Sequence, residues 1–294
     1  MSRVLLNMAI ADAYAMGWEF LKDPAEKPLH DWSGYKAHPQ IETYVASKYS
    51  DDTMRTLING RVILEADPFD PLDYVRVLKE EFRKDQRDGW SRKFRAHLTA
   101  QLDQPDEEWL RVLMPRNTNG GIMGAAVCGF LSDPRDVIRA ADTQARITHD
   151  DEAAIYASAC ALALHAMRTG AAGRQDLHSY VCGHDPRIAA LMPDIPVEAP
   201  ARSMLASDTY ATVMQILGQC GDFRGILDRT IAHGGDTDSI ASVAVAIASA
   251  GEGFEENYPD WAVTDLDCGD AASRDRLLEL GRALQEIGEP SPQA

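Results

Sequence analysis

Cysteine is scarce in this sequence of 294 residues, and its five cysteines include no CxxC pair. An odd number without that spacing argues against a disulfide framework and against a cysteine zinc site. We therefore expect reduced thiols in an intracellular protein. Cys128 and Cys160 stand in alanine-rich apolar segments, where cysteine typically serves as a small core residue.

Long hydrophobic runs are also missing. The longest run, residues 240–250, is far shorter than the roughly 20 residues that a membrane-spanning helix needs. The first ten residues lack the apolar segment and the cleavage site of a signal peptide. We expect no membrane association and a cytoplasmic location.

Basic residues are few: 29 Lys and Arg face 46 Asp and Glu, for a formal net charge of −17. This sign opposes bulk binding to nucleic acid or to an anionic membrane. An anionic ligand would need a cation to offset the field, and metal ions are one candidate. The 45% apolar and 26% charged residues are ordinary for a soluble globular protein, which excludes disorder and fibrous repeats.

Alternating strand patterns are absent, and helical periodicity dominates. We predict helices over residues 52–66, 71–84, 106–114, 121–131, 134–146, 151–169, 209–220, 223–232, 238–250 and 273–287. Residues 35–50 are irregular, 184–207 form a proline-rich connection, and 290–294 form a loose tail. Because similar helices flank the connection, we expect one all-α domain over residues 1–294.

A further helical pattern opens the chain. Leu5, Met8, Asp12, Met16 and Glu19 recur at three- and four-residue steps, with alanines between them. This spacing places Asp12 and Glu19 on one face together with apolar residues, an unusual position for two carboxylates.

Two acidic segments precede predicted helices. The first contains Ser50, Asp51 and Asp52, and the second, after a Gly-Gly pair, contains Asp236, Asp238 and Ser239. One explanation is helix capping, because Ser and Asp are preferred caps and acidic groups suit helix N-termini. If the two helix starts meet, however, these oxygens form a cage suited to two Mg²⁺ or Mn²⁺ ions.

The order of these segments resembles the ADP-ribosylglycohydrolase family, which includes the dinitrogenase reductase-activating glycohydrolases. The matching segments lie at residues 12–20, 49–53, 119–123, 148–149 and 234–239, and the likeness spans about 4–261. The resemblance implies a single-domain, all-α orthogonal helical bundle with a dinuclear Mg²⁺ or Mn²⁺ site at helix N-termini. It also implies a hydrolase that removes ADP-ribose from a modified protein or small molecule.

The resemblance also assigns roles by position. Glu19 matches an acidic residue over the metals, and Asp12 is expected to orient a neighbouring loop. Glu19 and Asp238 are the candidates for acid–base and electrostatic duties at the anomeric carbon. The implied metal ligands are Ser50, Asp51, Asp52, Asp236, Asp238 and Ser239.

Further residues are expected to bind substrate. The Asn119 loop (residues 119–123) resembles a cradle for the diphosphate and distal ribose, through its backbone N–H groups and the next helix. Here the sequence departs from the family: Gly124 replaces a usual Arg, and the segment before the loop, residues 115–118, differs from the family's. The expected substrate-binding residues are Asn119, Gly120, Gly121, Met123, His149 and, more weakly, Tyr210, for which core packing is the alternative.

The favoured function is metal-dependent cleavage of the bond between ADP-ribose and an arginine or serine side chain. One alternative is an HD-type all-α phosphohydrolase, built on the pairs His149-Asp150 and His184-Asp185. Another is a non-catalytic immunity or binding protein with the same fold.

Overall fold

The computed structural model describes residues 3–21, 30–112, 115–194 and 203–288. Within them the regular structure is helical, and the one β-type pairing is an isolated bridge between Asp222 and Glu255. The expected all-α fold is confirmed. The α-helices are α1 (Val4–Ala15), α2 (Asp51–Glu65), α3 (Pro71–Lys84), α4 (Arg92–Gln101), α5 (Asp106–Arg111), α6 (Pro134–Arg146), α7 (Asp151–Thr169), α8 (Leu177–His184), α9 (Pro186–Leu191), α10 (Ala206–Gln219), α11 (Phe223–His233), α12 (Thr237–Ser249), α13 (Trp261–Thr264) and α14 (Ala271–Gly288).

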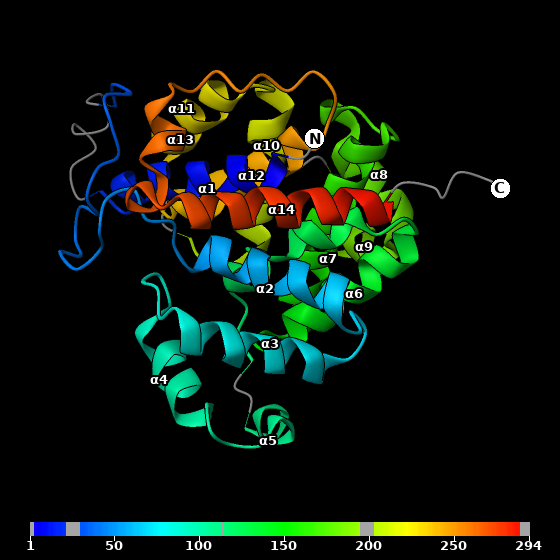
Figure 1. Ribbon diagram of the computed structural model, residues 1–294. Coiled ribbons are helices and arrows are strands. Elements are labelled where there is room, and N and C mark those ends of the chain that lie inside the picture. Colours follow the sequence, from blue (N-terminus) through cyan, green and yellow to red (C-terminus); the bar gives the residue numbers. More distant parts are fainter. Residues whose placement is uncertain (1–2, 22–29, 113–114, 195–202, 289–294) are drawn as a thin grey trace.

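Helices α1 and α12 pack against each other in the middle of the bundle (Figure 1). Every residue of both helices is buried, as expected for helices that are apolar on all sides. A polar side chain on either helix therefore lies in the interior. This is how Asp12 and Asp238 come to be buried.

Surface helices that carry strong start signals begin and end where the sequence predicts. Helices α3 and α6 are each capped by an aspartate, Asp70 or Asp133, followed by a proline at the first helical position. Aspartate supplies the cap acceptor, and proline has no N–H to leave unpaired there. Among the described residues, no helix is long and apolar enough to cross a membrane.

Three helical predictions need correction. The first helix ends at Ala15 and continues as a short 3-10 turn (Met16–Trp18), so Glu19 is extended and does not share a helical face with Asp12. The helix expected over 121–131 is two 3-10 turns, Asn119–Gly121 and Ala125–Phe130. Glycine lowers helix propensity there, and a Cβ at Gly129 would lie 2.4 Å from the Ala161 carbonyl oxygen.

The third correction concerns the proline-rich connection. Residues 186–191 form α9, with Asp185 as its cap and Pro186 at its first position. Residues 195–202 of this connection and the expected tail, 290–294, lie outside the described residues.

Residues 35–50 have no helix or strand, as predicted, and join α1 to α2 along one end of the bundle (Figure 1). The segment is held to the rest of the protein by hydrogen bonds. Tyr35 Oη donates to the Ala262 carbonyl (2.6 Å), and the Asp267 N–H donates to the Ser47 carbonyl (2.8 Å). This otherwise irregular segment is thereby fixed to α13 and to the 3-10 turn that follows it, Leu266–Gly269.

Candidate functional site

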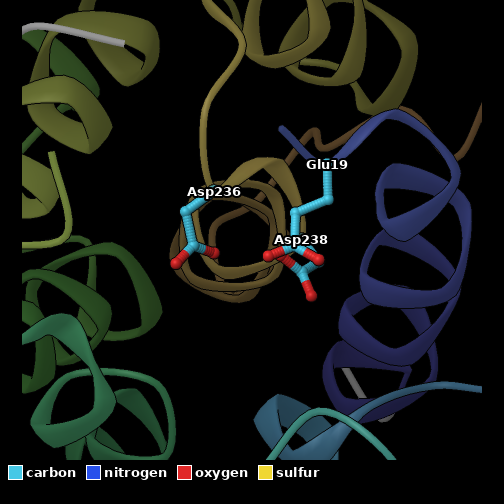
Figure 2. A group of neighbouring side chains, drawn as sticks. All are labelled: Glu19, Asp236 and Asp238. Atoms are coloured by element: carbon cyan, nitrogen blue, oxygen red, sulfur yellow. The ribbon is translucent and has the colours of Figure 1, made fainter. Parts of the chain in front are cut away.

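Three stretches of chain bring five carboxyl groups to one interior cavity. Glu19 follows the 3-10 turn after α1, Asp51 and Asp52 open α2, and Asp236 and Asp238 stand at the start of α12. All five line the same cavity. Oxygens of Glu19, Asp236 and Asp238 lie within 4.8 Å of one another, and Figure 2 shows their carboxyl groups gathered beside the start of α12.

The start of α12 is shaped by backbone conformation. Gly234 and Gly235 both have positive φ, 80° and 81°, which glycine adopts without steric cost. Asp236 holds the N-cap position but makes no side-chain cap hydrogen bond. Its Oδ2 instead accepts from Asn119 Nδ2 at 3.0 Å, so the Asn119 side chain orients this carboxylate.

The start of α2 is held by side chains. Ser50 is the N-cap, and its hydroxyl accepts from the Asp52 N–H. The Asp12 carboxylate accepts from the N–H groups of Ser50 and Thr53 and from the Thr53 hydroxyl, at 2.6–3.1 Å. Asp12 therefore orients the first turn of α2, the structural role expected for it. With the capping done by these groups, the Asp51 carboxyl is not needed as a cap.

Burial raises the pKa of four of the cavity's carboxyl groups, those of Glu19, Asp51, Asp52 and Asp238. The pKa of Asp51 is raised to about 8 by burial, with the Arg55 charge opposing and the Asp12 and Asp236 charges reinforcing the shift. The pKa values of Asp52 and Asp238 lie well above the usual range, for the same reason and because of their acidic neighbours. Ionising the whole group thus requires added positive charge.

The donor set fits a hard divalent cation. Carboxylate and hydroxyl oxygens are the ligands that Mg²⁺ and Mn²⁺ prefer, and the only charge in this set is negative. Of the implied ligands, Asp51, Asp52, Asp236, Asp238 and Ser239 line the cavity. Ser50 does not line the cavity; its hydroxyl donates to the Asp52 carboxylate and accepts from the Asp52 N–H.

Sequence reasoning missed His38, which holds Glu19. His38 Nε2 lies 2.6 Å from Glu19 Oε2, and the ring is almost fully buried. Its Nδ1 accepts from the N–H groups of Gln40 and Ile41, both at 3.0 Å, so in the neutral ring the proton is on Nε2 and is donated to Glu19. The only sequence signal was its place in an irregular segment that follows Glu19.

The cavity has a volume of about 410 Å³, within the range of small-molecule sites. The cavity is also lined by Asn119, Gly120, Met123 and His149, four of the residues that were expected to bind substrate. An aromatic wall, which the sequence did not suggest, is formed by Trp90, Phe94 and Trp109.

The Asn119 loop presents fewer backbone donors than expected. The N–H of Asn119 donates to the Met204 carbonyl, that of Gly121 to Thr118, and those of Ile122 and Met123 to Asn119 itself. These four groups are therefore engaged within the protein. The helix dipole expected behind the loop is also weaker, because short 3-10 turns replace the helix.

His149 lies under this loop. A Cβ at Gly120 would lie 3.0 Å from His149 Nε2, and one at Gly121 would lie 3.2 Å from its Cγ, so both glycines pack closely on the imidazole. The ring nitrogens meet the hydroxyls of Thr148 (2.7 Å) and Thr118 (3.0 Å). Burial and the nearby arginines lower its pKa to about 3, which keeps the ring neutral. Gly121 itself does not line the cavity.

The chain resembles known proteins in both sequence and fold. The sequence profile described as ADP-ribosylglycohydrolase matches residues 2–293. The chain belongs to the ADP-ribosylglycohydrolase family. An uncharacterized protein of Archaeoglobus fulgidus is similar to this family member, with 26% identity over 302 residues that cover 96% of this chain and 95% of the relative.

A solved structure described as an ADP-ribosylglycohydrolase-related protein complex shares the fold. Its TM-score is 0.75, and it covers 98% of this chain and 97% of its own, at 20% identity. Membership of the ADP-ribosylglycohydrolase family implies hydrolase activity of that type, ADP-ribosylated substrates and, in general, dependence on a metal.

The departure from the ADP-ribosylglycohydrolase pattern at Gly124 has a steric basis in this chain. A Cβ at Gly124 would lie 2.7 Å from Asn59 Nδ2 and 2.8 Å from the Arg55 carbonyl carbon. Asn59 also donates to the Gly124 carbonyl. Helix α2 therefore passes too close to the loop for any larger residue.

Two other expectations are not supported by the placement of the residues. The buried Tyr210 packs near Tyr156 and His178 and lies outside the cavity, so the prediction that it contacts the ligand is corrected to core packing. The aspartates of the two His-Asp pairs, Asp150 and Asp185, serve as the caps of α7 and α9. Helix capping accounts for both, and an HD-type metal site gains no support.

Proposed function

We propose that this protein hydrolyses the bond between ADP-ribose and a modified side chain, N-linked arginine or O-linked serine, and that it requires Mg²⁺ or Mn²⁺. The observation that supports this proposal is one cavity that is lined both by five carboxyl groups and by residues of the Asn119 loop. A vicinal ribose diol can reach the carboxylate end while the rest of the nucleotide lies along the loop.

The residues that would hold two ions are Asp51, Asp52, Asp236, Asp238 and Ser239, with Ser50 joining if its hydroxyl turns from Asp52. When bound, such ions supply positive charge that orients a diol and eases the deprotonation of water. They also allow the buried carboxyl groups to ionise, which their raised pKa values otherwise oppose.

Hydrolysis forms a bond from a water oxygen to the anomeric carbon as the bond to the arginine nitrogen or serine oxygen breaks. One proton leaves the water, and one reaches the departing group. Glu19 is our candidate for proton transfer, because its carboxyl group lines the cavity and burial raises its pKa. Asp238 is the candidate for stabilising positive charge on the sugar ring.

The proposal is tested with a panel of arginine- and serine-linked ADP-ribosyl substrates, with Mg²⁺, with Mn²⁺ and after dialysis against EDTA. We expect release of ADP-ribose with metal and none with EDTA. Glu19→Gln should lower kcat by about 10²–10⁴-fold, the usual contribution of acid–base catalysis, while ADP-ribose still binds. The control is Glu252→Gln, a change at an exposed residue that does not line the cavity.

Two results would contradict the proposal. Full turnover in excess EDTA would refute the metal requirement. Binding of ADP-ribose without cleavage of any substrate would favour the non-catalytic alternative.

A further inference from the structure

Arg55 is a buried cation that makes no direct ion pair within the described residues. Only 7% of its surface is exposed, and the charges of Asp51 and Asp52 act on its guanidinium without forming an ion pair with it. Its one hydrogen bond to those residues is from Nη2 to the Thr148 hydroxyl, at 3.0 Å. Buried charges are normally paired, since their desolvation is costly. A guanidinium has five N–H donors, so most of this group's donor capacity is unused within the described protein.

Arg55 lines the cavity close both to the carboxyl groups and to the Asn119 loop. It follows Asp51 and Asp52 by four and three residues on α2, which places it about one helical turn, roughly 5.4 Å, further along the same face. On its other side, Cζ lies 5.8 Å from the centre of the Phe94 ring. Thr148, which anchors Nη2, also contacts His149 under the Asn119 loop.

The cavity otherwise offers few donors for an anion. Four N–H groups of the Asn119 loop are engaged within the protein, and burial keeps His149 neutral. Of the three arginines that line the cavity in the described residues, Arg92 is exposed and Arg116 is half-buried, which leaves Arg55 as the buried one. The carboxyl groups and the net charge of −17 oppose an anionic ligand.

We infer that Arg55 binds the diphosphate of the ADP-ribosyl ligand and that it selects substrates carrying this oxyanion. The inference rests on the proposed function for the identity of the ligand. Guanidinium matches phosphate oxygens in a two-pronged geometry and remains charged, so it suits this position better than lysine. A ribose at the carboxylate end places its phosphate about one helical turn away, where Arg55 lies.

The competing explanation is that Arg55 only balances the charge of Asp51 and Asp52. The two explanations make opposite predictions for metal and anion. If Arg55 is only a counter-charge, its removal tightens Mn²⁺ binding and leaves the affinity for phosphate groups unchanged. If Arg55 binds the diphosphate, its removal weakens the binding of ADP-ribose and of inorganic pyrophosphate but not the binding of neutral ribose.

The experiment measures binding by calorimetry to the full chain at saturating Mg²⁺, for wild type, Arg55→Met, Arg55→Lys and the rim control Arg92→Met. We expect Arg55→Met to lower the affinity for ADP-ribose and for pyrophosphate by about 10- to 100-fold, the usual effect of losing a hydrogen bond to a charged group. Arg55→Lys should be intermediate, and Arg92→Met should change either affinity less than about twofold, because exposed charges are screened.

The outcomes separate the two proposals. ADP-ribose and pyrophosphate affinities within twofold of wild type in both Arg55 variants would overturn the inference while the proposed function stands. An equal loss of affinity in Arg92→Met would also overturn the inference, because any cation near the cavity would then be enough to attract the diphosphate. If wild type binds pyrophosphate through Arg55 but neither binds nor releases ADP-ribose, the proposed function fails and only the oxyanion site remains. If Arg55→Met does not fold, Arg55→Lys decides through the same comparison.

Discussion

The starts of α2 and α12 look alike in sequence but are built differently. At α2, Ser50 caps the helix and Asp12 holds its first turn from a distant part of the chain. At α12, two glycines with positive φ set the turn, and Asp236 makes no cap hydrogen bond. Carboxyl groups at both helix starts therefore remain available at the cavity. At α2 other side chains do the capping, and α12 has no side-chain cap.

The largest expected effect comes from Asp236→Asn or Asp238→Asn. Asparagine can still cap a helix but is not an anionic metal ligand, so kcat should fall at least about 100-fold and the thermal shift on adding Mn²⁺ should shrink. Without metal the variants should melt higher than wild type, because a buried carboxyl group has been removed. Turnover and circular dichroism test this.

The matched control for these variants is Asp70→Asn, which changes the cap of α3 away from the cavity. It should leave activity unchanged. If the Asp236 and Asp238 variants behave like this control, their carboxylates are not metal ligands.

The next effect is on stability as a function of pH and metal. In the metal-free protein the pKa of Asp51 is about 8, against 3.8 when unfolded, so from pH 6.5 to 8 the folded state holds a proton that the unfolded state has lost. Stability should therefore fall as pH rises, by up to about 1.4 kcal/mol per pH unit for each such proton. His149, with its pKa near 3, is neutral in the folded state, but about half of it is protonated in the unfolded state at pH 6.5, so it offsets part of this trend near pH 6.5 and little of it near pH 8.

Saturating Mg²⁺ or Mn²⁺ should remove this slope and raise stability by about 2.7 kcal/mol at a hundredfold excess over Kd. Melting temperatures measured across the pH range, with metal and with EDTA, provide the check. Identical slopes in the two series would show that the carboxyl groups do not bind the cation.

A smaller effect is expected at His38. His38→Phe preserves a ring beside Tyr44 but removes the proton donated to Glu19, which should lower kcat by about 10-fold and leave ADP-ribose affinity nearly unchanged. His38→Gln, which retains a donor, should recover part of the loss. A larger effect on affinity than on kcat would mean that His38 shapes the cavity instead of positioning Glu19.

The smallest effect is expected from removing the side-chain cap of α2. Ser50→Ala should cost about 1 kcal/mol of unfolding free energy, because α2 loses its side-chain cap. The loss should be the same with and without metal if Ser50 acts only as a cap. A loss that doubles in the presence of Mn²⁺ would show that its hydroxyl is also a ligand. Urea denaturation under both conditions measures the difference.

Local signals in the sequence predicted much of the fold. Helices α3, α6 and α7 begin and end where capping residues and apolar spacing placed them. Helix α4 was missed although Ser91 caps it, because its residues are mostly polar and its apolar periodicity is weak. Residues 121–131 were predicted as a helix, and the sequence contains no sign of the close approach of the Ala161 backbone to Gly129, because Ala161 lies far along the chain.

Some residues of the candidate site could likewise be identified from the sequence, and others could not. Asp51, Asp52, Asp236 and Asp238 were identifiable because each pair lies within a few residues of a helix start, where chemistry and spacing are local. His38 and Arg55 were not, because what singles them out is a partner remote in sequence: Glu19 for one and Thr148 for the other. Only packing of α1, α2 and α12 shows which carboxyl groups share a cavity.

The sequence by itself determined the helical class, the positions of most helices and the acidic residues available for a cation, because propensity, capping and apolar periodicity act over a few residues. The tertiary structure decided which of those groups lose their contact with water. Desolvation depends on every neighbour in space, so the raised pKa values, the buried charge of Arg55 and the engaged N–H groups of the Asn119 loop arise only when the helices of the bundle pack together.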